Sequence, residues 1–121
     1  MTDKLGRTGP DGHLSCMSNV SNIAVAGLRA AEARFAAKAE NIANANTQGY
    51  NPLTAEQIST AVGPVVRLSR QEKLRSTDKQ PEVDLARELT DLITIKYDYN
   101  ASVKVLRTAD ELNGTLLDIL A

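Results

Sequence analysis

The stretch "ENIANANTQGY", residues 40–50, decides how the chain folds, because a helical pattern ends within it. Asparagine forms helices poorly, since its short amide competes for nearby backbone groups. Asn41 and Asn44 nevertheless lie where the pattern is still helical. Gly49 supplies the left-handed position that commonly ends a helix, and Pro52 prevents the helix from resuming. The sequence therefore predicts that a helix closes here.

Upstream of this stretch, residues 19–44 have the pattern of a long amphipathic helix. The candidate N-caps are Ser18, Asn19 and Ser21. Apolar residues recur at spacings of three, four or seven, at Val25, Leu28, Phe35, Ala39 and Ile42. Glu32 interrupts this seam, while small residues form a parallel stripe at Ala24, Ala31 and Ala45. The apolar face is therefore wider than a strict coiled-coil line.

The C-terminal part of the chain predicts a second long helix, over residues 84–120. One series of alternating three- and four-residue steps contains Leu85, Leu89, Leu92, Tyr99, Val103, Leu106, Leu117 and Leu120. Polar residues on the same series, which typically fix register and partner number, are Lys96, Asp110 and Asn113. Pro81 suits a helix start, and Glu82, Asp84 and Glu88 suit the positive end of the helix dipole.

A short insert, residues 51–82, joins the two helices. "LTAEQIST" and "VVRLSRQE" carry β-branched residues in partial alternation, and "AVGP" between them has turn chemistry. We expect a small β-hairpin or an irregular insert here. The predicted fold is mainly α, with two long terminal helices pairing as an antiparallel coiled-coil hairpin around this insert.

Composition excludes several classes of function. The chain of 121 residues has no tryptophan and one phenylalanine, and ten alanines lie within residues 24–45. This predicts a helix-packing surface rather than a bulky core with a pocket. The formal net charge of −1 provides no field to collect nucleic acid or an anionic membrane.

The first residues of the chain stand apart from this pattern. Residues 1–16 have no apolar run, so they predict neither a secretory signal nor a membrane span. The sequence from Met17 onward would serve as a chain start. We interpret residues 1–17 as a flexible extension, contributed by an upstream start codon or by an expression vector. The N-terminal helix with its asparagine-rich signature (18–50), the short insert (51–82) and the C-terminal helix (83–121) follow it.

Two stretches carry a resemblance to a known family. "AENIANANTQGY" resembles the signature near the N-terminus of bacterial flagellar rod and hook proteins. "VDLARELTDLITIKYDYNASVKVLRTADELNGTLLDIL" resembles the C-terminal segment of the same family, including its T-A-D-E motif. The two matches, in this order, cover residues 18–50 and 83–120. In size the chain is most similar to the small proximal-rod subunits.

The resemblance implies a structural axial subunit of the flagellar basal body. Such a subunit is exported unfolded through the flagellar type III apparatus without a cleaved signal, and packs helically with itself and other rod proteins in the periplasm-spanning rod. No cofactor, metal or catalytic residue is implied, nor direct membrane insertion. The implied assembly interface comprises Leu28, Phe35, Asn41, Ile42, Asn44, Asn46, Thr47, Gly49, Tyr50, Leu85, Leu89, Leu92, Tyr99, Val103, Leu106, Asp110, Asn113 and Leu117.

The asparagines acquire a hypothetical role within this interface. Asn41 and Asn44 lie one turn apart, and each amide can donate and accept, so they could satisfy buried groups across a subunit contact and set its register. Asn46, Thr47, Gly49 and Tyr50 would shape the exit from the helix. The simpler alternative is a helix end with a glycine stop, which leaves the mid-helical asparagines unexplained.

The chain also departs from the family. The middle segment is short, glutamine replaces the common proline in "NTQGY", and the N-terminal extension is foreign to the pattern. These departures keep two alternatives open: a divergent rod-like paralogue, and a soluble helical adaptor that binds a partner through the same seam.

An enzyme or a metal site is the weaker alternative. His13 and Cys16 form the sole His/Cys cluster, and two ligands do not make a structural zinc site. As the single cysteine, Cys16 also excludes an intrachain disulfide. The neighbouring acids Asp110 and Glu111 point apart on a helix and are interpreted as surface charges rather than a general acid/base pair.

Overall fold

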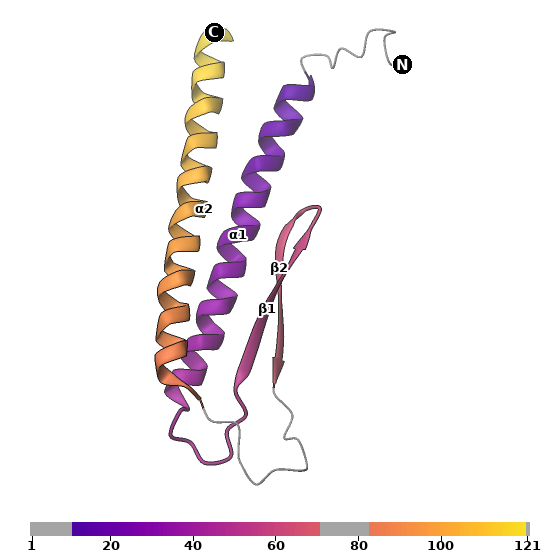
Figure 1. Ribbon diagram of the computed structural model, residues 1–121. Coiled ribbons are helices and arrows are strands. Elements are labelled where there is room, and N and C mark those ends of the chain that lie inside the picture. Colours follow the sequence, from indigo (N-terminus) through magenta and orange to yellow (C-terminus); the bar gives the residue numbers. More distant parts are fainter. Residues whose placement is uncertain (1–10, 71–82, 121) are drawn as a thin grey trace.

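The computed structural model describes residues 11–70 and 83–120 and contains two long helices with a β-hairpin between them (Figure 1). The elements in chain order are α1 (Asp11–Ala43), β1 (Leu53–Thr60), β2 (Gly63–Arg70) and α2 (Leu85–Leu120). In Figure 1, α2 lies along one side of α1 and the hairpin lies along another. The predicted mainly α fold, with two helices and an intervening hairpin, is confirmed.

Helix α1 is longer at its start and shorter at its end than the sequence predicted. It begins at Asp11, ahead of the predicted Asn19, so residues 11–17 are helical rather than part of a flexible extension. Residues 1–10 lie outside the described part. The helix ends at Ala43, where the amide of Asn44 still donates to the Glu40 carbonyl.

The hairpin follows the predicted strands closely. The strands are antiparallel, with Leu53 opposite Arg70 and Thr60 opposite Gly63. No non-glycine residue in the described ranges has a positive φ, whereas Gly63 has φ +121°. The turn at residues 61–62 therefore avoids the mirror-image geometry of many two-residue hairpins, and Gly63 takes the conformation that other residues resist.

Helix α2 begins with a side-chain cap. The Asp84 Oδ1 atom accepts hydrogen bonds from the amides of Ala86, at 3.0 Å, and Arg87, at 3.2 Å. These amides have no partner within the helix, which explains why an acidic N-cap fixes the start at Leu85. Glu88, which suits the positive end of the helix dipole, is buried at 8% exposure.

Small residues let the two helices approach closely. Among the described residues, the buried apolar side chains of α1 are all alanines: Ala24, Ala30, Ala31 and Ala37. A Cβ added to Gly27 would lie 2.8 Å from the Ser102 Oγ of α2, which places the two backbones side by side there. The alanine-rich sequence thus provides the predicted packing surface rather than a bulky core.

The stripe of α2 that faces α1 differs from the predicted seam. Its buried residues are Glu88, Ile95 and Ala109, and Ser102 lies against Gly27. These four positions are spaced by seven residues and lie one position before Leu89, Lys96, Val103 and Asp110 of the predicted series. The prediction was wrong for Leu89, Lys96 and Asp110, which are exposed, whereas Val103 is half-buried. Because α2 carries apolar residues on several sides, periodicity alone could not choose between adjacent stripes.

Candidate assembly surfaces

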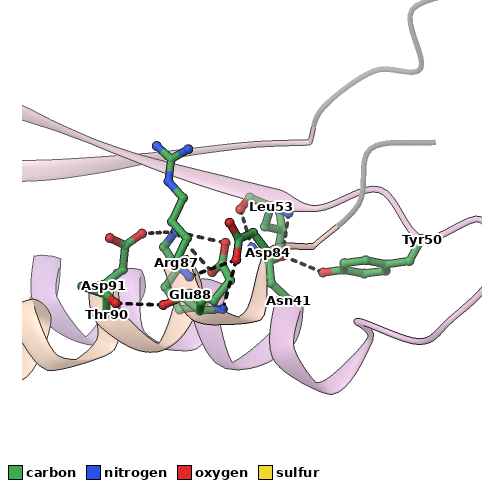
Figure 2. A network of polar contacts seen from close by, with 10 residues as sticks. Asn41, Tyr50, Leu53, Asp84, Arg87, Glu88, Thr90 and Asp91 are labelled. Carbon is green, nitrogen blue, oxygen red and sulfur yellow. Dashed lines mark hydrogen bonds and ion pairs between the residues drawn. The ribbon is translucent and has the colours of Figure 1, made fainter. Parts of the chain in front are cut away.

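Asn41 anchors the start of the hairpin to helix α1. Its Nδ2 donates to the Leu53 carbonyl at 2.8 Å, and its Oδ1 accepts from the Leu53 amide at 2.7 Å. The Tyr50 hydroxyl donates to the same Oδ1 at 2.9 Å (Figure 2). Asn41 is 1% exposed. Its amide thus pairs with Leu53 as a neighbouring strand would, through one donor and one acceptor.

This geometry answers why an asparagine lies inside the last turns of α1. Leucine or alanine there would leave both polar groups of Leu53 without these partners. The hypothesis that Asn41 acts across a subunit contact is therefore corrected: its side chain is buried and its hydrogen bonds are made within the chain.

The residues after Asn41 form the exit from the helix locally. Asn44 Nδ2 donates to the Glu40 carbonyl at 2.9 Å, and the Thr47 amide donates to the Asn44 carbonyl at 2.9 Å. The Tyr50 amide then donates to the Thr47 carbonyl at 3.2 Å, with Gly49 at φ +80° inside that turn. Gly49 has the predicted left-handed conformation, but in this turn rather than at the helix end.

Arg70 holds the end of the hairpin against this exit. Its guanidinium lies 3.0 Å from Glu40 Oε1, and it also donates to the Asn51 carbonyl at 3.5 Å. Burial raises the pKa of the Tyr50 hydroxyl, and the nearby Glu40 carboxylate raises it further, while Arg70 opposes the shift. Tyr50 consequently remains protonated as the donor to Asn41.

Ion pairs join the two helices on the hairpin side. Lys38 Nζ lies 2.7 Å from Asp91 Oδ2 and 3.2 Å from Glu88 Oε2. That Glu88 oxygen accepts no hydrogen bond, so the ion pair with Lys38 balances its charge. Burial alone would lower the pKa of Lys38, but the hydrogen bonds to Asp91 and Glu88 outweigh burial, and its pKa is raised.

Arg34, one turn before Lys38 on α1, connects three elements. Its Nη1 lies 2.8 Å from Asp98 Oδ2 on α2 and donates to Gln57 Oε1 of β1 at 3.1 Å. Arg34 and Lys38 also line one polar hollow with Leu53 and Glu88. The hairpin, α1 and α2 therefore meet along this flank of the helix pair.

The predicted interface residues divide into two sets. Those that are buried or half-buried within the chain are Leu28, Asn41, Ile42, Asn44, Tyr50, Leu92, Val103, Leu106 and Asn113. Those that face outward are Phe35, Asn46, Thr47, Gly49, Leu85, Leu89, Tyr99, Asp110 and Leu117. The second set remains accessible to another molecule.

Sequence analysis missed several residues of these surfaces. Ile95 is 2% exposed and packs against α1, and it was passed over because Lys96 fitted the chosen series. Ile58 and Val65 form an exposed pair across the hairpin, which the alternation of the predicted strands could have indicated. The anchoring of Leu53 by Asn41 has no signal in either residue alone.

No metal site is found among the described residues. In residues 11–70 and 83–120, no group of three or more His, Cys, Asp or Glu side chains could hold a metal ion. The side chains of His13 and Cys16 lie outside the described part. Neither helix, within its described residues, is long and apolar enough to cross a membrane.

Comparison with known families identifies the C-terminal segment. Residues 79–119, most of which form α2, match the family described as "Flagellar basal body rod FlgEFG protein C-terminal". The comparison with curated proteins finds no match. Residues 79–119 are therefore similar to the C-terminal segment of flagellar rod proteins, which confirms the resemblance found there. The family implies a structural, rod-related role, assembly with other rod proteins and a basal-body location.

Proposed function

We propose that this protein is an axial subunit of the flagellar basal-body rod and assembles helically with itself and with other rod proteins. The match of residues 79–119 to the rod family carries the proposal. The proposal includes export through the flagellar type III apparatus without a cleaved signal, a place in the periplasm-spanning rod and no enzymatic activity.

The helix pair supports this proposal. Lys38 contacts Asp91, Arg34 contacts Asp98, and Gly27 lies against Ser102. The residue numbers of these contacts fall along α1 as they rise along α2. This order fits an antiparallel coiled-coil hairpin, in which small residues alternate with larger ones across a narrow seam.

The outward face of α2 supports assembly. Its exposed large apolar residues are Leu85, Leu89, Ile93, Tyr97, Tyr99, Val105, Leu112, Leu116, Leu117 and Ile119. They lie along the whole helix, which is more than scattered single residues on an ordinary surface. Burying this surface against neighbouring copies would stabilise a filament through the hydrophobic effect.

Mass spectrometry of basal bodies, purified with detergent from the cell that encodes the chain, tests the proposal. We expect peptides of α1 and α2 at several copies per basal body, together with the other rod proteins. A matched pair of variants sharpens the test. Leu89→Ser and Leu117→Ser together should remove the chain from basal bodies, whereas Thr90→Ser and Thr115→Ser should not.

Absence of the unmodified chain from basal bodies that contain the other rod proteins would refute the rod assignment. Recovery of the chain in a closed, soluble complex of fixed stoichiometry would instead identify a helical adaptor or a divergent paralogue. The same measurement determines the first residue of the working protein.

A further inference from the structure

An apolar groove lies between the two helices. It measures about 370 Å³ and is lined by Ala31, Glu32, Phe35, Ile95, Lys96 and Tyr99. Ala31 and Ile95 are buried at its base, whereas Phe35 is 52% exposed and Tyr99 is 38% exposed. One acidic residue, Glu32 of α1, and one basic residue, Lys96 of α2, flank it. The groove thus offers two aromatic walls and two opposite charges.

The outer face of the hairpin carries a small apolar patch with the same pair of charges. Ile58 and Val65 lie directly opposite each other across the strands, and both are exposed. Two residues along, on the same face because side chains alternate in a strand, Glu56 of β1 lies opposite Arg67 of β2. On the other face, Ala55 and Val66 are half-buried, while Leu68 is exposed.

The groove and the hairpin occupy different flanks of the helix pair. Arg34 marks the hairpin flank, because it contacts both Gln57 of β1 and Asp98 of α2. Phe35 is one residue further, about 100° around α1, and Tyr99 is one residue beyond Asp98 on α2. The lining of the groove accordingly includes no residue of β1 or β2 of the same chain.

We propose that the outer face of the hairpin of one copy docks into the groove of a second copy. Ile58 and Val65 would enter between Phe35 and Tyr99 of the second copy. In one of the two orientations along the groove, Glu56 approaches Lys96 and Arg67 approaches Glu32, whereas the reverse orientation brings like charges together. Charge complementarity therefore selects both the occupant and its direction. This proposal rests on the proposed self-assembly and names the surfaces that perform it.

The arrangement of the two surfaces determines the kind of assembly. Because the contact joins two different surfaces on different flanks, each copy retains one unused hairpin and one unused groove. Such a heterologous contact propagates, and it produces an open filament where the rotation between copies does not close a ring. A two-fold dimer would instead need one surface that pairs with itself.

Directed cross-linking tests the contact in full-length chains that carry Cys16→Ser. One chain carries Ile58→Cys and the other, labelled with ¹⁵N to distinguish it by mass, carries Phe35→Cys. A short bismaleimide is added at a concentration where sedimentation shows self-association. We expect products that join the two chains to exceed products that join identical chains. Ala36→Cys, exposed on α1 beside Phe35, is the matched control and should give little product with Ile58→Cys.

Charge reversal gives a second readout. Lys96→Glu alone and Glu56→Lys alone should each weaken self-association about three- to tenfold, and the chain that carries both should recover it. The docking contact would be overturned if Ala36→Cys gave as much cross-linked product with Ile58→Cys as Phe35→Cys does. It would also be overturned if the chain with both charge reversals did not recover self-association. A chain that remains monomeric would also overturn it, while its presence in basal bodies would still support the proposed rod function.

Discussion

Asn41 shows how one side chain can determine where a segment begins. Its side-chain amide bonds the backbone of Leu53, the first residue of β1, in place of a neighbouring strand. The Tyr50 hydroxyl holds this side-chain amide in place through a third hydrogen bond. A buried side chain with three hydrogen bonds also limits how α1 can end. The asparagine that weakens the helix locally is therefore retained for a contact twelve residues away.

Replacing Asn41 by alanine should lower the free energy of unfolding by about 2–3 kcal/mol, because it leaves the amide and carbonyl of Leu53 without these partners. Asn44→Ala is the matched control. The Asn44 side chain bonds a carbonyl that already accepts a backbone amide, so its loss should cost less than about 1 kcal/mol. Urea denaturation followed by circular dichroism measures both variants. Equal losses would show that Asn41 has no special role.

Alkaline pH should destabilise the fold through Lys38 and Tyr50. Both groups have a folded-state pKa above their ordinary values of 10.5 and 10.0. The folded chain therefore binds more protons than the unfolded chain in this range, and stability falls as pH rises. Their contribution is complete below about pH 10 and is lost as pH rises through the raised values.

Unfolding measured at a series of pH values from neutrality upward tests this sign. Lys38→Arg keeps its charge throughout the range, and Tyr50→Phe has no proton to lose. The chain that carries both should show a smaller alkaline loss than the wild type. An unchanged slope would mean that other groups dominate the titration.

At the scale of elements, α1, α2 and the hairpin could be predicted from sequence, because periodicity and turn residues are local signals. The contacts between elements could not. Four residues of the predicted α2 seam are half-buried: Leu92, Val103, Leu106 and Asn113. However, Ile95 rather than Lys96 packs against α1. The alanines of α1 are small enough to pack against either stripe. Lys38 and Arg34 form ion pairs with Asp91 and Asp98, each three residues after a buried position of the stripe that packs.

Ile95 and Leu89 separate folding from assembly on α2. Ile95→Ala removes a side chain that is 2% exposed and should lower the free energy of unfolding by about 2–5 kcal/mol. Leu89 is 53% exposed, so Leu89→Ala should cost less than about 1 kcal/mol. Thermal unfolding of the two variants at a concentration where the chain is monomeric distinguishes them. Comparable losses would favour the seam predicted from sequence.

Gly63 makes a matched pair with Gly49 in the hairpin region. A Cβ at Gly63 would lie 2.7 Å from the Ala26 Cβ of α1, whereas a Cβ at Gly49 meets nothing within 4 Å. Both residues have positive φ, so each alanine substitution costs about 1–2 kcal/mol in backbone conformation. Gly63→Ala should cost more because it also pushes the hairpin away from α1. Similar shifts in melting temperature for the two variants would contradict this close approach.

At the scale of the whole molecule, the helix pair is held more strongly at one end than at the other. The ion pairs of Lys38 and the Asn41 contacts lie at the end where α1 finishes and α2 begins. Toward the opposite end the helices diverge (Figure 1), and apolar side chains there are exposed, including Val20, Ile23, Leu112, Leu116 and Ile119. An isolated copy therefore has a secured end and an end that lacks internal burial.

Amide hydrogen exchange should report this difference directly. In the monomer we expect the slowest exchange around Asn41, Glu88 and Ile95, and the fastest exchange in α2 after Ala109, because local opening is easiest where few apolar contacts are made. On assembly the same C-terminal amides should gain the most protection, since neighbouring copies would supply the missing burial. The monomer held below its association concentration is the control. Uniform protection along α2 before assembly, or no gain after it, would mean that this end is already stable alone and does not depend on neighbouring copies.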